Sequence, residues 1–484
     1  MNAKKPNQKK KNKNNKKNKK MISKSKTFNI NYSAKIINIT SFRPHSNPEV
    51  NKLKCCRVDG FNIITGINSE PGLYVYFPVD CQINSEFLSS NNLFRDKELN
   101  QDKTESGLFE QNCRVRSVSL KGEKSEGFII PVSSLQNFIK GFKVSKNDIG
   151  VDFDKIEDKI LCKKYVIVHK QTNATSSKKG KKVKKEKSLH IVENQFKFHV
   201  NTTLIKKVPH AISPDSLISI TEKVHGTSGI SANLLCQKPL KGIKSLINSF
   251  NRFANQVLYK LGIDYKLDIN KNVYMDFCSS RTVIKSKIHN PSASDGFYKV
   301  DVWGIAHNEI KKLLTEGMTI YYEIIGYLPS GGYIQKDYDY GYVPPKSAHD
   351  YKYNVNYGIR VYRITQTNSS GHVFEFSARQ VQEWCKLNDI RPVIQYYYGY
   401  AKDLYPDIPV DQNWNDRFIE ALSNDRNFHM EQSSPTCMNK VPHEGIVIRS
   451  EDLSINVYKL KCFKFLDKES KLLDKGESDI ESES

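Results

Sequence analysis

The first part of the chain, residues 27–135, consists of short runs of alternating apolar and polar residues that are separated by turn residues. Clear examples are SAKIINITSF, GLYVYFPVD and CRVRSVSL. Strands of this length and spacing are typical of a small antiparallel barrel or sandwich. The size of the segment fits a five-stranded OB barrel, a fold that often binds nucleic acid, although the fold alone does not establish that function.

After about residue 210 the pattern changes to strands that alternate with helices, which indicates a separate α+β domain. Apolar residues recur at helical intervals between residues 240 and 261 and predict an amphipathic helix. They are Leu240, Ile243, Ile247, Phe250, Ala254, Val257 and Leu261. We expect this helix to pack its apolar side against the rest of the domain.

The chain therefore divides into two folded regions with polar segments at its ends. The expected boundaries are a Lys-rich tail over residues 1–26, the barrel over 27–149, a second domain over 150–470 and an acidic tail over 471–484. A Lys-rich loop, residues 171–188, interrupts the second domain. The N-terminal tail has too few apolar residues to fold by itself, and it either holds phosphates or only solubilises the chain.

Lysine and arginine outnumber the acids by 75 to 52, but the excess is uneven. Residues 1–26 hold twelve lysines and no acid, and residues 178–187 contribute six further positive charges. About +5 of the formal charge of +23 remains for the rest of the chain. The folded part is only mildly basic, so the net charge alone does not argue for a nucleic-acid partner.

Several classes of protein can be set aside. No stretch has the roughly eighteen consecutive apolar residues that cross a bilayer, and the basic N-terminus lacks the apolar segment of a secretory signal. The ten cysteines include no CxxC pair, which disfavours structural zinc and indicates a reducing compartment. We therefore expect a soluble, cytoplasmic, monomeric protein without a membrane partner.

One lysine stands at the end of an apolar run, in the segment LISITEKVHGTSG. Gly226 lets the chain turn tightly, so that Lys223 can point its amine into a cleft. A free lysine amine has a pKa of about 10.4, and it attacks nothing until desolvation or nearby cations favour its neutral form. Taken alone, this segment is better explained by a surface lysine.

Two carboxylates lie in apolar strands further along the chain. Glu323 stands among large apolar side chains in MTIYYEIIGY, and Glu444 begins the strand of HEGIVIRS. A buried carboxylate needs a partner, because an unpaired buried charge is costly. For Glu323 that partner is a ribose hydroxyl, a cation or a salt bridge within the domain, whereas the position of Glu444 suits a ligand to Mg²⁺.

A fourth segment, INVYKLKCFKF, combines lysines with large apolar residues. On a single strand, Lys459 and Lys461 would point to the same face as Phe463 and Phe465. This mixture is explained better by the floor of a cleft, where cations meet phosphates, than by an exposed basic edge strand. Cations close to Lys223 would also disfavour protonation of its amine.

In this order the four segments resemble the nucleotidyltransferase motifs of the covalent ATP-dependent ligase and capping-enzyme superfamily. EKVHGTS resembles motif I, YYEIIG motif III, HEGIVIRS motif IV and YKLKCFKF motif V, while CSSRTVIKS and GIRVYRIT resemble the elements beside the bound AMP. The resemblance implies that Lys223 is the catalytic nucleophile and that Glu444 binds the metal. The residues that it implies for nucleotide binding are Glu222, Val224, His225, Gly226, Arg281, Glu323, Tyr362, Lys459 and Lys461.

Within this superfamily the chain resembles the RNA ligases. His225, followed by Gly-Thr, is typical of RNA ligases, whereas DNA ligases and capping enzymes usually carry Asp at that position. Only 23 residues follow Lys461, so we expect no C-terminal OB domain. A barrel at the N-terminus resembles the Deinococcus-type RNA ligases. Ser228, where phage RNA ligases have Asn, and Arg363, where many relatives have Asp, depart from the pattern.

The resemblance implies an α+β chain in which an N-terminal antiparallel OB-like β-barrel precedes a ligase-type nucleotidyltransferase domain of antiparallel sheets and helices. It also implies ATP and Mg²⁺ or Mn²⁺ as cofactors. The reaction would have three steps: Lys223 takes AMP from ATP, the AMP passes to a 5′-phosphate, and a 3′-hydroxyl attacks that phosphate and displaces the AMP. The partner would be RNA or an RNA-containing duplex with such ends, above all at a nick. Two alternatives stay open: a catalytically silent nucleic-acid-binding protein, and a DNA ligase or capping-type nucleotidyltransferase.

Overall fold

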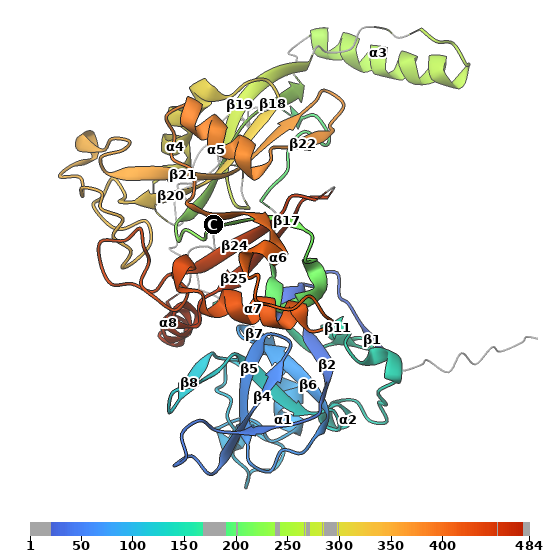
Figure 1. Ribbon diagram of the computed structural model, residues 1–484. Helices are drawn as coiled ribbons and strands as arrows, with labels where there is room; N and C mark the ends of the chain where they lie inside the picture. The colour runs from blue at the N-terminus through green and yellow to red at the C-terminus, as the bar shows by residue number, and fades with distance from the viewer. Residues whose placement is uncertain are drawn as a thin grey trace, which may run out of the picture. The chain divides into compact units, whose positions relative to one another are not determined.

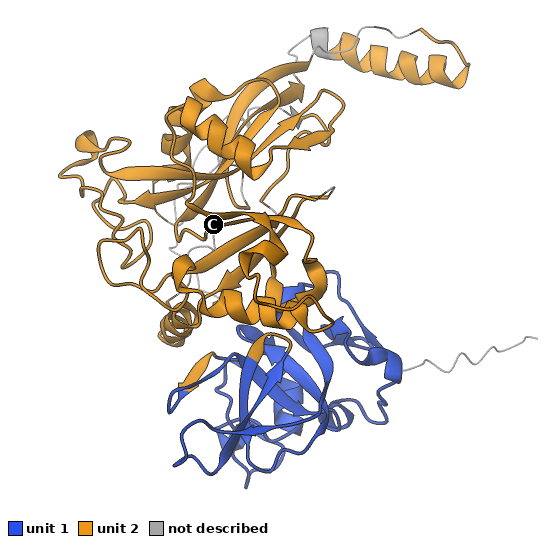
Figure 2. Ribbon diagram, in the orientation of Figure 1, with its two compact units in different colours: residues 1–58, 62–116, 120–165 blue, residues 59–61, 117–119, 166–484 orange. Residues whose placement is uncertain are grey.

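The computed structural model divides the chain into two compact units (Figure 2). Unit 1 comprises residues 1–58, 62–116 and 120–165, and unit 2 comprises the remainder. The structure describes residues 21–167, 190–199, 202–237, 243–265, 267, 272–282, 284, 298, 300–452 and 454–477. The first twenty residues of the Lys-rich tail and the Lys-rich loop 171–188 lie outside the described residues.

Unit 1 is built around an antiparallel sheet in the order β10-β6-β2-β11. Its strands are β2 (Ala34–Ile39), β6 (Gly72–Pro78), β10 (Gly127–Pro131) and β11 (Asp152–Phe153). The alternation that predicted strands here places one side of the sheet in the core, with Ala34, Ile36, Val75, Phe77 and Phe153 fully buried.

Smaller sheets complete the strand pairings of this region. Their strands are β1 (Ile22–Ser23), β3 (Arg43–Pro44), β4 (Leu53–Val58), β5 (Phe61–Gly66), β7 (Cys81–Ile83), β8 (Val118–Leu120), β9 (Glu123–Ser125), β12 (Lys155–Ile156), β13 (Lys159–Ile160) and β14 (Cys162–Lys164), beside the short helices α1 (Ser85–Ser90) and α2 (Ser134–Phe138). The expected antiparallel strands are present, but the described pairings do not close into one five-stranded barrel. Because β11 pairs with β2 and β14 with β7, unit 1 continues to Tyr165, beyond the expected boundary at residue 149.

Unit 2 contains a six-stranded antiparallel sheet in the order β15-β18-β20-β21-β22, with β19 also paired to β18 (Figure 1). The strands are β15 (His190–Ile191), β18 (Thr227–Gln237), β19 (Asn272–Ser280), β20 (Met318–Gly326), β21 (Tyr357–Thr367) and β22 (Val373–Glu375). All nine residues of β20 are buried, which explains its nearly continuous apolar sequence. Helices α4 (Val302–Ile310) and α5 (Ala378–Leu387) contribute to the same core.

A five-stranded sheet forms the other half of unit 2, in the order β16-β25-β24-β17-β23. Its strands are β16 (Thr203–Leu204), β17 (Leu217–Glu222), β23 (Gln395–Tyr400), β24 (Gly445–Ser450) and β25 (Asn456–Lys461). Only the pairing of β16 with β25 is parallel among these described strands. Helices α6 (Ala401–Leu404), α7 (Trp414–Asn424) and α8 (Phe463–Asp474) cover its core.

The strand expected through INVYKLKCFKF ends earlier than its pattern suggested. Strand β25 stops at Lys461, and Phe463 begins helix α8, so the expectation that Phe463 and Phe465 continue the strand is wrong. The carboxylate of Glu431 explains the change, because it accepts hydrogen bonds from the backbone N–H groups of Phe463 at 2.6 Å and Lys464 at 3.3 Å. These bonds satisfy donors that the first turn of a helix leaves unpaired.

The amphipathic helix expected near residues 240–261 is present as α3 (Ile243–Lys260). The expectation that its apolar side packs against the domain is wrong, since Leu246, Ile247, Phe250 and Phe253 are all exposed. Among the described residues, no helix is both long enough and apolar enough to cross a bilayer.

A chain of polar side chains, buried except at Asp276, links helix α4 to the three strands β18, β19 and β20. The two ring nitrogens of His307 lie 3.0 Å from Ser231 Oγ and 3.0 Å from Asp276 Oδ2, and Ser231 also bonds the hydroxyl of Tyr322 at 2.9 Å. Burial lowers the pKa of His307 from its ordinary value of 6.5, and the hydrogen bond to Asp276 only partly opposes this effect.

This lowered pKa predicts a loss of stability in acid. The folded state resists protonation of His307 while the unfolded state accepts it, so its contribution is complete above pH 6.5 and declines as the pH falls toward the folded-state pKa. The urea midpoint of the unaltered chain should fall between about pH 7.5 and about pH 5.5. We expect a smaller fall in His307→Gln, which has no imidazole to protonate. The matched control is His349→Gln at an exposed site. Equal decreases in both variants would contradict the assignment.

Candidate functional site

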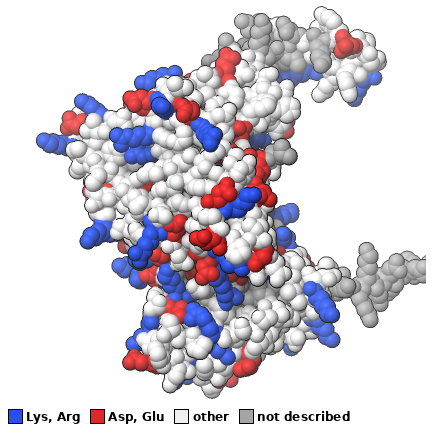
Figure 3. Space-filling view, viewed as in Figure 1, with Lys and Arg blue, Asp and Glu red and all other residues white. Residues whose placement is uncertain are grey.

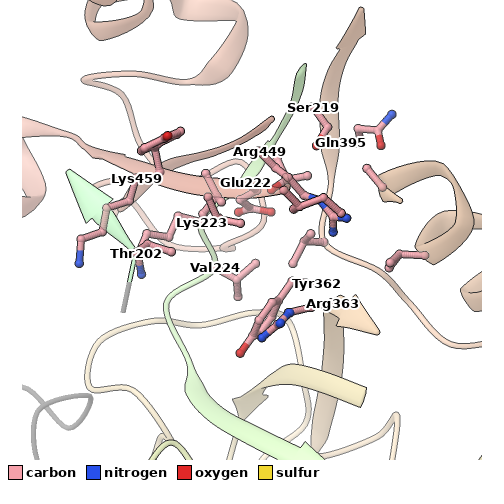
Figure 4. A pocket seen from close by; sticks show the side chains of 18 of the residues that line it. Thr202, Ser219, Glu222, Lys223, Val224, Tyr362, Arg363, Gln395, Arg449 and Lys459 are labelled. Atoms are coloured by element: carbon pink, nitrogen blue, oxygen red, sulfur yellow. The ribbon is translucent and has the colours of Figure 1, made fainter. Parts of the chain in front are cut away.

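A cavity of about 340 Å³ lies between the two sheets of unit 2 (Figure 4). The five-stranded sheet contributes Ser219, Thr221, Glu222, Gln395, Val447, Arg449, Val457, Tyr458 and Lys459, and the six-stranded sheet contributes Glu323, Tyr362, Arg363 and Glu375. In the close view, Tyr362 and Arg363 face Glu222 and Lys223 across the pocket. The two sheets therefore present opposite walls to whatever fills this space.

Lys223 reaches the pocket because of the strand that precedes it. Ser219, Thr221 and Glu222 of β17 line the pocket, and Lys223 directly follows the last residue of this strand. The backbone N–H of Lys223 donates to Gly445 O at 2.9 Å, which extends the pairing of β17 with β24 past the end of the strand. This pairing fixes the position of the amine in the pocket.

After Lys223 the chain crosses from one sheet to the other, and the crossing is tightly held. The hydroxyl of Tyr340 accepts from His225 N at 3.1 Å and donates to His225 O at 2.8 Å, while Gln335 Nε2 donates to Gly226 O at 2.8 Å. A Cβ atom on Gly226 would lie 2.6 Å from Ile324 O. The backbone therefore approaches β20 so closely that only glycine fits.

Glu444 is the point where the cationic groups converge. Its side chain is 1% exposed, and its Oε1 lies 2.5 Å from Lys223 Nζ and 3.8 Å from Lys461 Nζ. Its Oε2 lies 3.3 Å from His225 Nδ1. The structure thus brings together the predicted nucleophile, metal ligand and two of the predicted nucleotide-binding residues, although Glu444, His225 and Lys461 lie behind the pocket lining.

Lys461 is positioned by helix α8. Its amine pairs with Glu469 Oε2 at 2.9 Å and lies 4.9 Å from the centre of the Phe465 ring. Lys459, two residues earlier on β25, lines the pocket instead. Of the two lysines of this strand, Lys459 can therefore contact a ligand directly, while Lys461 contacts Glu444.

The opposite wall carries the other predicted residues. The hydroxyl of Tyr362 lies 3.1 Å from Ser228 Oγ and 3.1 Å from His199 Nδ1. Burial raises the pKa of Tyr362, and the charge of Glu323 raises it further, so the phenol stays neutral. Glu323 is opposite Ser228 in the register of β18 with β20, and Arg281 follows β19 into the pocket.

Glu222 and Val224, on either side of Lys223, also line the pocket. The carboxylate of Glu222 accepts a hydrogen bond from Thr436 Oγ1 at 2.7 Å. Burial raises the pKa of Glu222, while the bond from Thr436 and the positive charge of Arg360 oppose the shift. Gly226 does not line the cavity, and its role is to let the chain pass close to β20.

Sequence reasoning missed a network of ion pairs in the pocket wall. Arg363 donates two hydrogen bonds of 2.7 Å to Glu375, and Arg449 lies 3.8 Å from Glu375 and 3.0 Å from Glu451. The signal was an arginine inside each of two apolar strands, GIRVYRIT and HEGIVIRS. The partners could not be found, because Glu375 and Glu451 carry no distinguishing pattern in the sequence.

Two polar side chains at one end of the pocket were also missed. Among the described residues, Ser219 Oγ and Gln395 Oε1 are buried atoms without a hydrogen-bond partner, and both residues line the cavity. Buried polar groups of folded proteins are nearly always hydrogen-bonded. A polar edge of a ligand would satisfy both atoms.

The carboxylate next to Lys223 fits a divalent cation only together with oxygen atoms of a ligand. In the described part of the chain, no group of three or more His, Cys, Asp and Glu side chains is arranged to hold a metal. Glu444 offers a buried carboxylate next to Lys223, and Mg²⁺ commonly binds one or two carboxylates together with water and substrate phosphates. The arrangement therefore suits a cation that arrives with a phosphorylated ligand.

Comparison with solved structures finds similarity to Naegleria gruberi RNA ligase. Its structure with pyrophosphate is 13% identical, with a TM-score of 0.47 over 91% of this chain and 99% of that chain. A lysine-to-alanine mutant of that ligase with ATP and Mn is 13% identical, with a TM-score of 0.47 over 90% of this chain and 98% of that chain. Another lysine-to-alanine mutant, in the apo state, is 14% identical, with a TM-score of 0.49 over 90% of this chain and 98% of that chain. No protein-family model and no curated protein matches the sequence.

Proposed function

We propose that this chain is an ATP-dependent RNA ligase that joins 3′-hydroxyl and 5′-phosphate ends and carries AMP on Lys223. The observation that carries the proposal is the position of this lysine. It lines a pocket together with Arg281 and Lys459, and its amine lies 2.5 Å from the buried carboxylate of Glu444. Phosphoryl-transfer sites work mainly by positioning the reactants and offsetting their negative charge, which these groups can do.

In the first step the neutral amine of Lys223 attacks the α-phosphorus of ATP. A bond forms between Nζ and phosphorus, the bond to the bridging oxygen breaks, and pyrophosphate leaves with the electron pair while the amine releases its proton to solvent. Arg281 and Lys459 offset the charge that develops on the phosphate oxygens. The product is a phosphoramidate between Lys223 and AMP.

The adenosine would lie between the two walls of the pocket. The ring of Tyr362 and the side chain of Val224 supply apolar surface, and Ser219 and Gln395 supply polar atoms for an edge of the base. Glu323 lines the same pocket and would accept a hydrogen bond from a ribose hydroxyl. Each of these groups binds and orients the nucleotide without reacting.

Mg²⁺ or Mn²⁺, held by Glu444 together with phosphate oxygens, would supply positive charge at the phosphates. His225 and Lys461, which do not line the pocket, also contact Glu444, at 3.3 and 3.8 Å. Lys461 is itself fixed by Glu469 at 2.9 Å. The carboxylate is therefore held in place by more than its contact with Lys223.

In the later steps AMP passes to a 5′-phosphate, and a 3′-hydroxyl then attacks that phosphate and releases AMP. We propose that the substrate is RNA or an RNA-containing duplex, that a nick is the preferred end structure, and that the chain acts as a cytoplasmic monomer. Unit 1, as an OB-like domain, would hold the complementary strand. Its antiparallel sheet of β10, β6, β2 and β11 supports this assignment.

Covalent labelling tests whether Lys223 carries AMP. Incubation with α-labelled ATP and Mg²⁺ should leave label on the denatured protein, and EDTA should abolish it. Lys223→Ala should remove the label, whereas Lys346→Ala, at an exposed lysine of unit 2, should keep it. Labelling by GTP alone would favour a capping-type enzyme. The absence of any label would indicate a catalytically silent nucleic-acid-binding protein.

Substitution of Lys459 tests the part that its charge plays in the transfer of AMP. Lys459→Met keeps the length of the side chain but removes its cation, and we expect the labelling rate to fall on the order of 100-fold, as for loss of one charge-stabilising group. Lys459→Arg keeps the charge and should lose less. A Met variant that labels as fast as the unaltered chain would contradict a phosphate contact for Lys459.

A comparison of two strand ends tests the kind of nucleic acid that is joined. In a sealing assay on nicked duplexes, a strand with a ribose at its 3′-hydroxyl end should be joined faster than the same strand with a deoxyribose there, because we assign the chain to RNA. The amount of adenylylated 5′-end, measured in the same reaction, separates the transfer of AMP from the final step. Equal sealing of both ends would favour a DNA ligase.

A further inference from the structure

Helix α3 exposes its apolar side. Four of its large apolar side chains, Leu246, Ile247, Phe250 and Phe253, are between 54% and 72% exposed, and Val257 is also exposed. These residues recur every three or four positions and so form one continuous face. Large contiguous apolar surfaces on folded proteins mark interaction sites.

The C-terminal end of the helix is defined by its own sequence and does not depend on this face. Gly262 has a φ of +70°, Ile263 N donates to Leu258 O at 3.0 Å, and Gly262 N donates to Tyr259 O at 3.1 Å. This pair of hydrogen bonds is the Schellman motif, in which a left-handed glycine ends a helix. Local hydrogen bonds therefore end the helix at this point, while its apolar face stays exposed.

The polar side of α3 faces its flanking chain. Arg252 donates to the side chain of Gln237 at 3.3 Å, and Asn255 exchanges two hydrogen bonds with the backbone of Leu267, at 2.7 and 3.0 Å. Helical spacing places Arg252 and Asn255 opposite Phe250 and Val257. Contacts with neighbouring residues thus engage the polar side.

The charge of this segment has a single sign. Residues 238–263 contain Lys238, Lys241, Lys244, Arg252 and Lys260 and no acid. Together with the twelve lysines of residues 1–26 and the six net charges of residues 178–187, these five cations account for the whole formal charge of +23. The rest of the chain is neutral, and on the face drawn in Figure 3 the two signs are interspersed.

We propose that α3 is a docking element for an anionic lipid bilayer, lying in the plane of the surface with its apolar face among the acyl chains. A helix with Phe, Leu and Ile on one face and only cations among its charged residues has the composition of interfacial membrane helices. RNA would pair with the cations but leave the aliphatic face in water. A second copy of α3 would bring two purely cationic segments together.

This proposal departs from the expectation of a chain without a membrane partner. That expectation rested on the lack of a stretch long enough to cross a bilayer, which does not bear on a helix that lies in the plane of the surface with exposed side chains such as Phe250 and Phe253. The lysines of residues 1–26 and 178–187 would add attraction to anionic headgroups. Their contribution is electrostatic and sensitive to salt, whereas insertion of the apolar face is not.

The test is sedimentation of the full chain with phosphatidylcholine vesicles, prepared with and without phosphatidylserine, at physiological ionic strength. We expect binding to the phosphatidylserine vesicles and a decrease of about tenfold or more for Phe250→Glu/Phe253→Glu. The control Leu387→Glu/Met438→Glu makes the same change of charge at two side chains of unit 2 that are 83% and 75% exposed, and it should bind like the unaltered chain. Thermal melting checks that both variants are folded.

A tryptophan at the helix locates the contact. The emission of Phe253→Trp should shift to shorter wavelength when phosphatidylserine vesicles are added, and that of Leu387→Trp should not. Equal vesicle binding by the α3 double variant and the unaltered chain, or no binding by the unaltered chain, would overturn the proposal. So would light scattering that shows a dimer converted to a monomer by the α3 double variant, since the face would then cover a second copy.

Discussion

The buried ion pair between Glu444 and Lys223 is the constraint on which the rest of unit 2 depends. A carboxylate with 1% of its side chain exposed is stable only when cations and donors surround it, and here Lys223, His225 and Lys461 do so. These groups come from the end of β17, the crossing that follows it and the end of β25. The antiparallel pairings of β17 with β24 and of β24 with β25 bring these groups together, and the ion pair then holds the amine of Lys223 against Glu444 at the pocket.

The crossing between the two sheets gives the site its two walls. Residues 223–226 leave the five-stranded sheet and enter β18 of the six-stranded sheet, held by Tyr340 and Gln335 and confined by the close approach of Gly226 to Ile324. Because Lys223 lies at this crossing, it faces Tyr362 and Arg363 from the other sheet. A ligand between the sheets would contact both walls, so its binding and the relative position of the sheets are coupled.

Positive charge serves two different purposes in this chain. In and beside the pocket, several cations lie close to carboxylates, as Arg363 does to Glu375 and Lys461 to Glu469. In residues 1–26, 178–187 and 238–263 the cations have almost no acids among them. Such segments attract anionic surfaces over a distance, which a paired cation cannot do.

The sequence by itself determined the elements whose signals are local. The periodicity of apolar residues predicted α3 and the strands around Lys223 and Glu323. The order of the four motif segments singled out the charged residues that the structure gathers around Glu444. The tertiary structure decided what depends on partners far along the chain: Glu431 ends β25 and begins α8, Glu375 joins Arg363 to Arg449, and nothing in the periodicity of α3 could show that its apolar face stays exposed. A periodic pattern specifies which side of an element is apolar, but the surface that covers it is set by the packing of the whole unit.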